Sequence, residues 1–332
     1  MSQHRTSALR IFETPAGTFE RRIVELGAKD LPDHDVLVRV NWSALNYKDA
    51  LSASGNKGVT RKYPFTPGID AAGVVEESRD SRWQPGAEVI VTGYDLGMNT
   101  PGGFGGFIRV PGDWVVAKPT GLNLRETMIL GTAGFTAAQS AMQLRAHGVL
   151  PASGPVVVTG AAGGVGSLAV AILSGLGYKV SAVTGRLHEA DFLRRMGASE
   201  VLPRQQILEQ PNRPMLPARW AGAVETAGGP MLETVLRSTL QRATVACCGL
   251  VSSAEFKMNV FPFLLRGVRL IGIDSAECPR PERLEMWRLL AGEFKPRRLD
   301  EIAQEVDLSG LSGKIDEILQ GRVRGRVILR HG

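Results

Sequence analysis

The segment 160–166 consists of small residues, four of them glycine, between two apolar runs. Pro155–Thr159 has the composition of a buried strand, and Ser167–Leu176 that of a buried helix. Gly163 would let a pyrophosphate group approach the backbone, and Gly166 would let helix and strand pack closely. Ala161 stands where the commonest fingerprint has its first glycine, so the pattern is A-x-G-x-x-G. A turn that only packs closely would look alike, but the order of elements favours a dinucleotide cofactor.

The end of the next predicted strand, Lys179–Thr184, indicates which dinucleotide the chain would bind. NAD-preferring proteins carry an acidic residue near the end of this strand, and here the chain continues with Gly185 and Arg186. A carboxylate would repel a 2′-phosphate, whereas the Thr184 hydroxyl and the Arg186 guanidinium can bind it. The pattern therefore predicts NADPH, with Arg204 as a weaker candidate for a second cation. The alternative is that Arg186 is an ordinary surface arginine.

The first third of the chain is predicted to be a β-rich lobe. Short alternating runs separated by Gly, Pro and Asp occur at Val36–Val40, Ala71–Glu76, Glu88–Thr92 and Phe107–Val110. The segment Gly93–Gly106 holds six glycines and has no periodicity. We expect it to be a loop that can move over a site.

The middle of the chain alternates between strand and helix, which is typical of a parallel, doubly wound Rossmann sheet. We expect a β-rich catalytic domain at 1–125, completed by 280–332, and an NADPH-binding domain at 126–279. The expected helices are Arg125–Ala146 with an interruption at Gly131–Gly134, Glu189–Met196, Leu232–Leu240 and Glu282–Gly292. The further expected strands are Ala221–Glu225, Ala243–Cys247, Val268–Ile273 and Arg326–Arg330, the last returning to the first lobe.

Composition narrows the class of protein. Hydrophobic residues make up 43% and charged residues 22%, as in ordinary globular proteins. The absence of a spanning apolar stretch or a secretory signal predicts a cytoplasmic protein. Three cysteines without a Cys-x-x-Cys pair, and five histidines, argue against a zinc site. The net charge of +6 is spread along the chain, which fits a solvated surface or phosphorylated small molecules as well as it fits nucleic acid.

Three motifs, together with the order of the lobes, carry a family resemblance. They are Pro67-Gly68-Ile69-Asp70-Ala71-Ala72-Gly73-Val74-Val75, Gly102-Gly103-Phe104-Gly105-Gly106-Phe107 and Gly131-Thr132-Ala133-Gly134-Phe135-Thr136-Ala137. The chain resembles the medium-chain dehydrogenase/reductase superfamily over nearly its whole length. Zinc-dependent members carry a Cys ligand and a Gly-His-Glu triplet where this chain has Asn46-Tyr47-Lys48-Asp49 and Gly68-Ile69-Asp70. The resemblance is therefore to the zinc-free quinone oxidoreductase and enoyl reductase branch, with no metal.

Within that branch the strings Ser43–Leu51, Thr184–Arg186 and Val201–Arg204 look most like the NADPH-dependent acrylyl-CoA reductases. This resemblance implies reduction of the carbon–carbon double bond of acrylyl-CoA to propionyl-CoA. It implies a catalytic site at Asn46, Asp49, Asp70 and Arg326, to which the chemistry of proton transfer adds Tyr47. The implied cofactor contacts, with Gly166 from the turn itself, are Tyr47, Ala162, Gly163, Gly164, Val165, Gly166, Thr184, Gly185, Arg186, Arg204, Leu250, Leu264 and Ser275.

The chemistry of these residues leaves several roles open. Hydride addition to an unsaturated thioester needs a donor for the developing enolate oxygen, which Asn46 or Arg326 can supply. A proton must reach the α-carbon from Tyr47 or water, oriented by Asp49 or Asp70. Alternatively, both aspartates are structural and Tyr47 is only a wall of the nicotinamide pocket. The tail contains two Gly-Arg pairs, at Arg322 and Arg326, and we assign the second to the site.

Three functions follow as hypotheses. The first is an NADPH-dependent enoyl thioester reductase, the second a reductase of free quinones or enones, and the third a non-enzymatic NADPH-binding protein. The expected partners are a small-molecule substrate and a second copy of the chain in a homodimer, with no nucleic acid and no membrane. The family resemblance implies that the strand Val268–Ile273 pairs edge to edge in that dimer.

Overall fold

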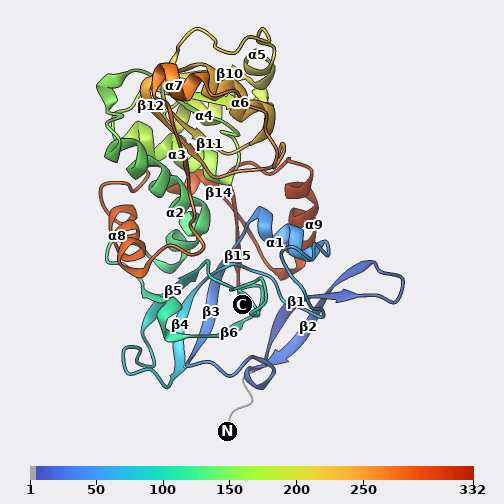
Figure 1. The fold of residues 1–332 in the computed structure, drawn as a ribbon. Coiled ribbons are helices and arrows are strands. Elements are labelled where there is room, and N and C mark those ends of the chain that lie inside the picture. The colour runs from blue at the N-terminus through green and yellow to red at the C-terminus, as the bar shows by residue number, and fades with distance from the viewer. Residues whose placement is uncertain (1–4) are drawn as a thin grey trace. The chain divides into compact units, whose positions relative to one another are not determined.

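The computed structural model describes residues 5–332, which form two compact units (Figure 1). The first unit comprises the chain up to Thr132 together with Ala276–Ala291 and Asp300–Gly332. The second comprises Ala133–Ser275 and Gly292–Leu299. Among residues 5–332, no helix is both long and apolar enough to cross a lipid bilayer.

The first unit is built on a seven-stranded sheet. The strand order is β14-β15-β3-β4-β5-β7, with β6 also pairing with β3. The last strand, β15, runs antiparallel to β3, with Val327 opposite Leu45. Alternate residues of β3 and β4 enter an apolar core with Leu96 and Trp83. The strands are β3 (Val36–Leu45), β4 (Asp70–Ser78), β5 (Glu88–Thr92), β6 (Phe107–Val110), β7 (Val115–Ala117), β14 (Ala303–Val306) and β15 (Arg326–Arg330).

Elements that the sequence pattern did not predict complete this unit. An antiparallel hairpin is formed by β1 (Arg5–Glu13) and β2 (Phe19–Gly27). The short helix α1 (Tyr47–Ala53) follows β3 and packs with α9 (Leu308–Leu319) over a second apolar cluster. The helix α8 (Arg280–Leu290) also belongs to this unit, and unlike the others it was expected, at Glu282–Gly292.

The loop 93–106 is packed tightly, which corrects the expectation of a mobile cover. Most of it is buried. A Cβ atom on Gly102 would lie 2.3 Å from the carbonyl oxygen of Gly68, and one on Gly103 would lie 2.3 Å from that of Asp70. These glycines therefore allow two backbone segments to touch, and they are not a sign of mobility.

The second unit contains six parallel strands in the order β10-β9-β8-β11-β12-β13. This is the Rossmann order, which reverses between β8 and β11 and confirms the predicted fold class. The strands are β8 (Val156–Val158), β9 (Val180–Thr184), β10 (Glu200–Pro203), β11 (Trp220–Glu225), β12 (Thr239–Cys247) and β13 (Arg269–Gly272). The helices are α3 (Gly164–Gly175), α4 (Ala190–Arg195), α5 (Arg204–Leu208), α6 (Gly229–Arg237) and α7 (Phe261–Arg266).

Of two further helices, one differs from the expectation and one agrees with it. The helix expected at Leu232–Leu240 begins at Gly229 and ends at Arg237, because β12 already starts at Thr239. The long helix α2 (Leu124–Ala146) is interrupted, as expected, and the break lies at Gly131, whose φ of 49° is not helical.

Candidate active site and cofactor site

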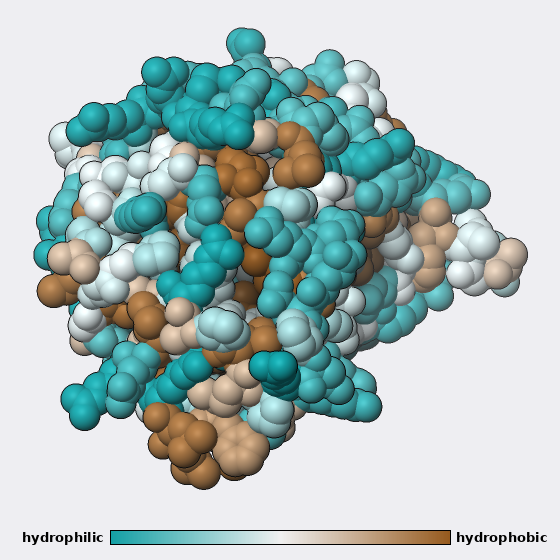
Figure 2. Space-filling view, turned by 90° about the horizontal axis from the view of Figure 1, so that it is seen from above, coloured by the Kyte–Doolittle hydropathy of each residue, from teal (hydrophilic) through white to brown (hydrophobic). Residues whose placement is uncertain are grey.

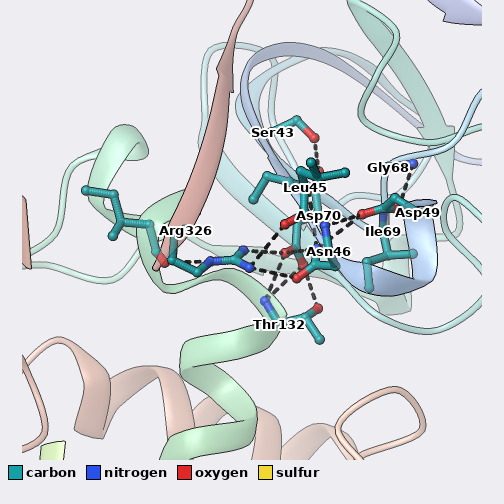
Figure 3. A network of polar contacts seen from close by, with 11 residues as sticks. Ser43, Leu45, Asn46, Asp49, Gly68, Ile69, Asp70, Thr132 and Arg326 are labelled. Atoms are coloured by element: carbon teal, nitrogen blue, oxygen red, sulfur yellow. Dashed lines mark hydrogen bonds and ion pairs between the residues drawn. The ribbon is translucent and has the colours of Figure 1, made fainter. Parts of the chain in front are cut away.

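Four predicted site residues of the first unit meet in one buried cluster (Figure 3). Asn46 ends the junction between β3 and α1, Asp49 lies on α1, and Asp70 and Arg326 begin β4 and β15. Asp49 and Asp70 are 0% exposed, Arg326 is 3% exposed and Asn46 is 8% exposed. Charged groups at this depth must be compensated inside the protein.

The Asp49 carboxylate is surrounded by N–H donors. Its Oδ1 accepts hydrogen bonds from the backbone of Gly68, at 3.0 Å, and Ile69, at 2.8 Å. Its Oδ2 accepts from the backbone of Asn46 at 2.8 Å and from the Asn46 amide at 3.3 Å. Burial raises the pKa of Asp49 to about 7, the charge of Asp70 adds to this rise, and the hydrogen bonds from Asn46 and Ile69 oppose it. Asp49 therefore ties the start of α1 to the segment before β4.

Asp70 lies at the centre of the cluster. Its carboxylate accepts from the backbone of Thr132 at 3.0 Å and from the Thr132 hydroxyl at 2.6 Å. It also accepts from the Asn46 amide at 2.9 Å and forms an ion pair with Arg326 at 3.5 Å. A Cβ atom on Gly131 would lie 2.4 Å from Asp70 Oδ2, so the break in α2 makes room for the carboxylate. No role was assigned to Thr132 from the sequence, although this residue lies in the motif 131–137.

The Arg326 guanidinium donates its hydrogen bonds to acceptors inside the protein. Its Nε donates to the carbonyl of Ile129 at 3.1 Å, and its Nη1 donates to Asn46 Oδ1 at 2.9 Å and to the carbonyl of Leu45 at 3.3 Å. Burial lowers the pKa of Arg326, and the charges of Asp70 and Asp49 oppose the shift. With these donors engaged, the geometry favours Arg326 as a positioning residue over an electrophile that touches substrate. The amide of Asn46 is engaged in the same way.

The tail places Arg326, and not Arg322, in this cluster. Gly325 has a φ of 60°, and a Cβ atom on it would lie 2.1 Å from the carbonyl oxygen of Ile302. The chain can turn there only with glycine, and the next residue points into the cluster. Arg322 is exposed.

Among the predicted catalytic residues of the first unit, Tyr47 is the one that lies outside the buried cluster. It is the first residue of α1, between Asn46 and Asp49, and is only partly buried. Its hydroxyl has no hydrogen-bond partner among residues 5–332. Of the predicted catalytic residues, Tyr47 is thus the one with a donor still available to a ligand.

In the second unit, the turn between β8 and α3 has the form that a pyrophosphate needs. The helix begins at Gly164, with Gly163 as its N-cap, and continues for 12 residues. A Cβ atom on Gly166 would lie 2.3 Å from the carbonyl oxygen of Gly160. Ala162 is buried and Val165 is partly exposed at the same turn. Backbone N–H groups at such a helix start bind phosphate groups, so the chain fits a dinucleotide here.

Two cations lie at the end of β9. The Arg186 backbone N–H donates to Thr184 Oγ1 at 3.0 Å, and its Nη2 donates to the carbonyl of Ala162 at 3.0 Å. Arg204, the first residue of α5, lies beside Gly185, whose Cβ would be 3.2 Å from the Arg204 guanidinium carbon. The structure therefore brings Arg204 to the segment 184–186, where a 2′-phosphate is expected.

The other predicted cofactor contacts are scattered. Leu250, after β12, is 59% exposed, and Leu264, on α7, is 74% exposed. Ser275 ends the long stretch of the second unit. Cys247, Cys248 and Cys278 are free thiols. Among the described residues, no group of three His, Cys, Asp or Glu side chains could hold a metal ion.

The fold and the turn define a two-domain oxidoreductase in which a GroES-like unit accompanies a Rossmann unit. Residues 32–120 match the model of the alcohol dehydrogenase GroES-like domain, and residues 164–292 match that of the zinc-binding dehydrogenases. The chain belongs to the medium-chain dehydrogenase/reductase family, among the homologues of the acrylyl-CoA reductases and related quinone-oxidoreductase-like proteins.

Three relatives are similar over nearly their full length. The acrylyl-CoA reductase AcuI of Ruegeria pomeroyi is 45% identical over 95% of both chains. The NADP-bound yhdH oxidoreductase of Salmonella enterica is 41% identical, with a TM-score of 0.95 over 98% of this chain and 100% of that one. The yhfP protein of Bacillus subtilis, with NAD bound, is 41% identical, with a TM-score of 0.95 over 98% of this chain and 99% of that one.

Proposed function

We propose that this protein is an NADPH-dependent reductase of the carbon–carbon double bond of a small α,β-unsaturated acyl thioester, of the acrylyl-CoA to propionyl-CoA type. The observation that carries the proposal is the 45% identity with an acrylyl-CoA reductase over 95% of both chains. The cations at Arg186 and Arg204 support NADPH, because a 2′-phosphate needs positive partners.

NADPH, when bound, supplies the hydride that adds to the β-carbon. The residues proposed to hold it are Tyr47, Leu250, Leu264 and Ser275, the turn 162–166, the segment 184–186 and Arg204. The second unit would bind the pyrophosphate at the start of α3 and the 2′-phosphate at the end of β9. We therefore propose residues 126–279 as the NADPH-binding domain, whereas the compact second unit comprises Ala133–Ser275 and Gly292–Leu299.

The charged cluster of the first unit has a positioning role in this proposal. As hydride arrives, negative charge develops on the thioester oxygen, and a proton must later reach the α-carbon. Asn46, Asp49, Asp70 and Arg326 direct their polar groups at one another, so they act by fixing the backbone at the start of α1. Tyr47, which lies on that backbone, is the proposed donor to substrate or to a water molecule.

The second candidate is a reductase of free quinones or enones. It is favoured by the 43% identity, over 92% of this chain and 93% of its own length, with the putative quinone oxidoreductase YhfP of Bacillus subtilis. Because the yhfP structure holds NAD, it also makes NADH the alternative cofactor. The third candidate, a non-enzymatic NADPH-binding protein, predicts binding without turnover.

A single panel separates the three candidates. NADPH and NADH consumption is followed at 340 nm with acrylyl-CoA, a benzoquinone and a simple enone, and the product of the first is identified by mass spectrometry. We expect propionyl-CoA and a kcat/KM for the thioester at least tenfold above the other values. Faster turnover of the quinone would favour the second candidate, and binding of NADPH without any turnover the third.

We further propose a cytoplasmic homodimer. The strand β13 is the last in its sheet order, so one edge has no neighbouring strand among the described residues. Exposed apolar side chains that have no proposed cofactor role concentrate nearby in the sequence, at Val251, Phe256, Val260, Phe261 and Leu265. Figure 2 shows apolar side chains gathered among polar ones on one face of the molecule. Sedimentation equilibrium tests the proposed homodimer, and a monomer at micromolar concentration would refute it.

A further inference from the structure

A carboxylate that no predicted role uses is buried beside the glycine-rich turn. Glu225 ends β11 and is 0% exposed. The preceding residue, Val224, pairs with Val158 of β8, and Glu225 itself pairs with Cys247 of β12. Its carboxylate therefore lies at the edge of the sheet from which the turn 160–166 starts. An acidic residue closing an otherwise apolar strand is a signal that the sequence already contained.

Hydrogen bonds, and no cation, compensate this charge. Oε1 accepts from Thr159 Oγ1 at 2.9 Å and from the Ala227 backbone at 3.0 Å, and Oε2 accepts from the Gly228 backbone at 2.9 Å. The thiol of Cys247 points at Oε2 from 3.9 Å. None of the described lysines or arginines forms an ion pair with Glu225. Burial raises the pKa of Glu225, and these hydrogen bonds oppose the rise.

The carboxylate joins the turn after β8 to the turn after β11. Thr159, which holds Glu225, also accepts from the Thr226 backbone at 2.9 Å, while the Thr226 hydroxyl donates to the Thr159 carbonyl at 2.8 Å. A Cβ atom on Gly160 would lie 2.3 Å from Thr226 Oγ1. The first residue of the glycine-rich turn is thus packed directly on a turn that Glu225 organises.

A third segment rests on the same turn. The Cys248 backbone donates to the Glu225 carbonyl at 2.9 Å, and the Ser252 backbone donates to the Ala227 carbonyl at 2.7 Å. A Cβ atom on Gly249 would lie 1.8 Å from the Thr226 carbonyl oxygen. The position of the segment 248–252, which contains Leu250, therefore depends on where Glu225 holds residues 226–228.

We propose that Glu225 is a positioning residue for the dinucleotide, acting through Thr159 and the backbone of residues 226–228 to fix the glycine-rich turn and the segment 248–252 relative to each other. This rests on the proposed binding of NADPH. Both segments must stay in place for the turn to present its N–H groups to the pyrophosphate. Preorganisation of this kind appears as affinity, because the cofactor does not have to order the turn when it binds.

The test compares Glu225→Gln with two Thr159 variants. The glutamine keeps the size of the side chain but turns an amide donor toward N–H donors that need an acceptor. We expect the Kd for NADPH, measured by fluorescence titration, to rise at least tenfold, with kcat at saturating NADPH falling less. Thr159→Val should also raise the Kd for NADPH. Thr159→Ser, which keeps the hydroxyl, should have a Kd close to that of the unmodified protein.

Thr239→Val is the matched control. It removes a hydroxyl that is also 0% exposed, and that donates to the Val235 carbonyl at 2.7 Å, but at the start of β12. We expect it to lower Tm and leave Kd unchanged. If Glu225→Gln and Thr159→Val do the same, the inference is wrong. If Glu225→Gln does not fold, the Thr159 pair decides by itself, and absence of NADPH binding in the unmodified protein would instead overturn the proposed function.

Discussion

The two candidate sites are built in opposite ways. The glycine-rich turn of the second unit lies within one continuous segment, 156–166, and consists of backbone groups. The cluster of the first unit joins side chains that are far apart in sequence, such as Asn46 and Arg326, which are separated by 280 positions. Backbone geometry at a turn tolerates substitution only where there is space, whereas a buried charge cluster fails as soon as one partner is lost. Substitutions at each site test that contrast.

The largest effect is expected for Arg326→Ala. Asp70 would remain buried without its cationic partner, which costs on the order of 3–5 kcal/mol of unfolding free energy. The loss of support at the start of α1 should also lower kcat about a hundredfold, as misplacement of a catalytic group by about 1 Å can do, with a smaller change in NADPH affinity. Steady-state kinetics and chemical denaturation measure both quantities.

Arg322→Ala is the control for this prediction, because that arginine is exposed. It should leave kcat and Tm within error of the parent protein. Should Arg326→Ala fail to fold, Arg326→Lys keeps the charge but not the planar set of donors. Unchanged kcat in Arg326→Ala would remove this residue from the mechanism, and unchanged kcat in Arg326→Lys alone would show that its charge suffices.

Arg186→Ala tests whether the second unit recognises the 2′-phosphate of NADPH. Losing one charge-assisted contact to the 2′-phosphate should weaken NADPH binding by about 1.5–3 kcal/mol and leave NADH binding nearly unchanged. Calorimetric titration with both cofactors measures the difference. Arg194→Ala, an exposed arginine of the same unit on α4, is the control. Equal losses for NADPH and NADH would mean that the contact of Arg186 with Ala162 is structural.

Gly166→Ala tests close packing in the turn itself. The new Cβ would meet only backbone atoms, at 2.3 and 2.7 Å, so the strand–helix junction must shift. We expect a loss of about 1–3 kcal/mol in stability, together with weaker NADPH binding. Gly175→Ala, at the other end of α3, meets nothing within 4 Å and should be neutral or slightly stabilising. Similar Tm values for the two variants would contradict this reading of the turn.

The last prediction concerns Asp49 and the dependence of stability on pH. Its pKa in the folded protein, about 7, lies well above the ordinary value of an aspartate, about 3.9. The folded protein therefore binds an extra proton between these values, and the stability this provides below the unfolded pKa is lost as pH rises toward 7. The slope from one proton is at most about 1.4 kcal/mol per pH unit. Denaturation from pH 4 to pH 8 should show a shallower slope for Asp49→Asn, and equal slopes would refute the assignment.

The same contrast explains how much of the molecule was predictable. The strand–turn–helix at 155–176 and the run 184–186 could be interpreted because sequence neighbours there are also neighbours in space. The contacts of Thr132 with Asp70 could not, because they depend on the break in α2 and on the pairing of β4. The interpretation of loop 93–106 was wrong for a related reason, since glycine permits both mobility and close packing, and only the partner segment at 68–70 distinguishes them.

The hairpin β1–β2 was missed because its second strand shows little alternation, with Glu20, Arg21 and Arg22 in a row. The roles of Asn46 and Arg326 show the same limit at the site. Their residue types suggested donors to substrate, and only the acceptors around them reveal that their hydrogen bonds are made inside the protein.

The distance along the chain between Asn46 and Arg326 has a consequence for biosynthesis. A ribosome makes the polypeptide from its N-terminus, so all six strands of the Rossmann sheet are complete before β15 is made. The second unit can fold while Asp49 and Asp70 still lack Arg326 and β3 has not yet paired with β15. The charge cluster must then close over a long loop, a late step that costs chain entropy. A nascent chain can therefore bind nucleotide before it can catalyse.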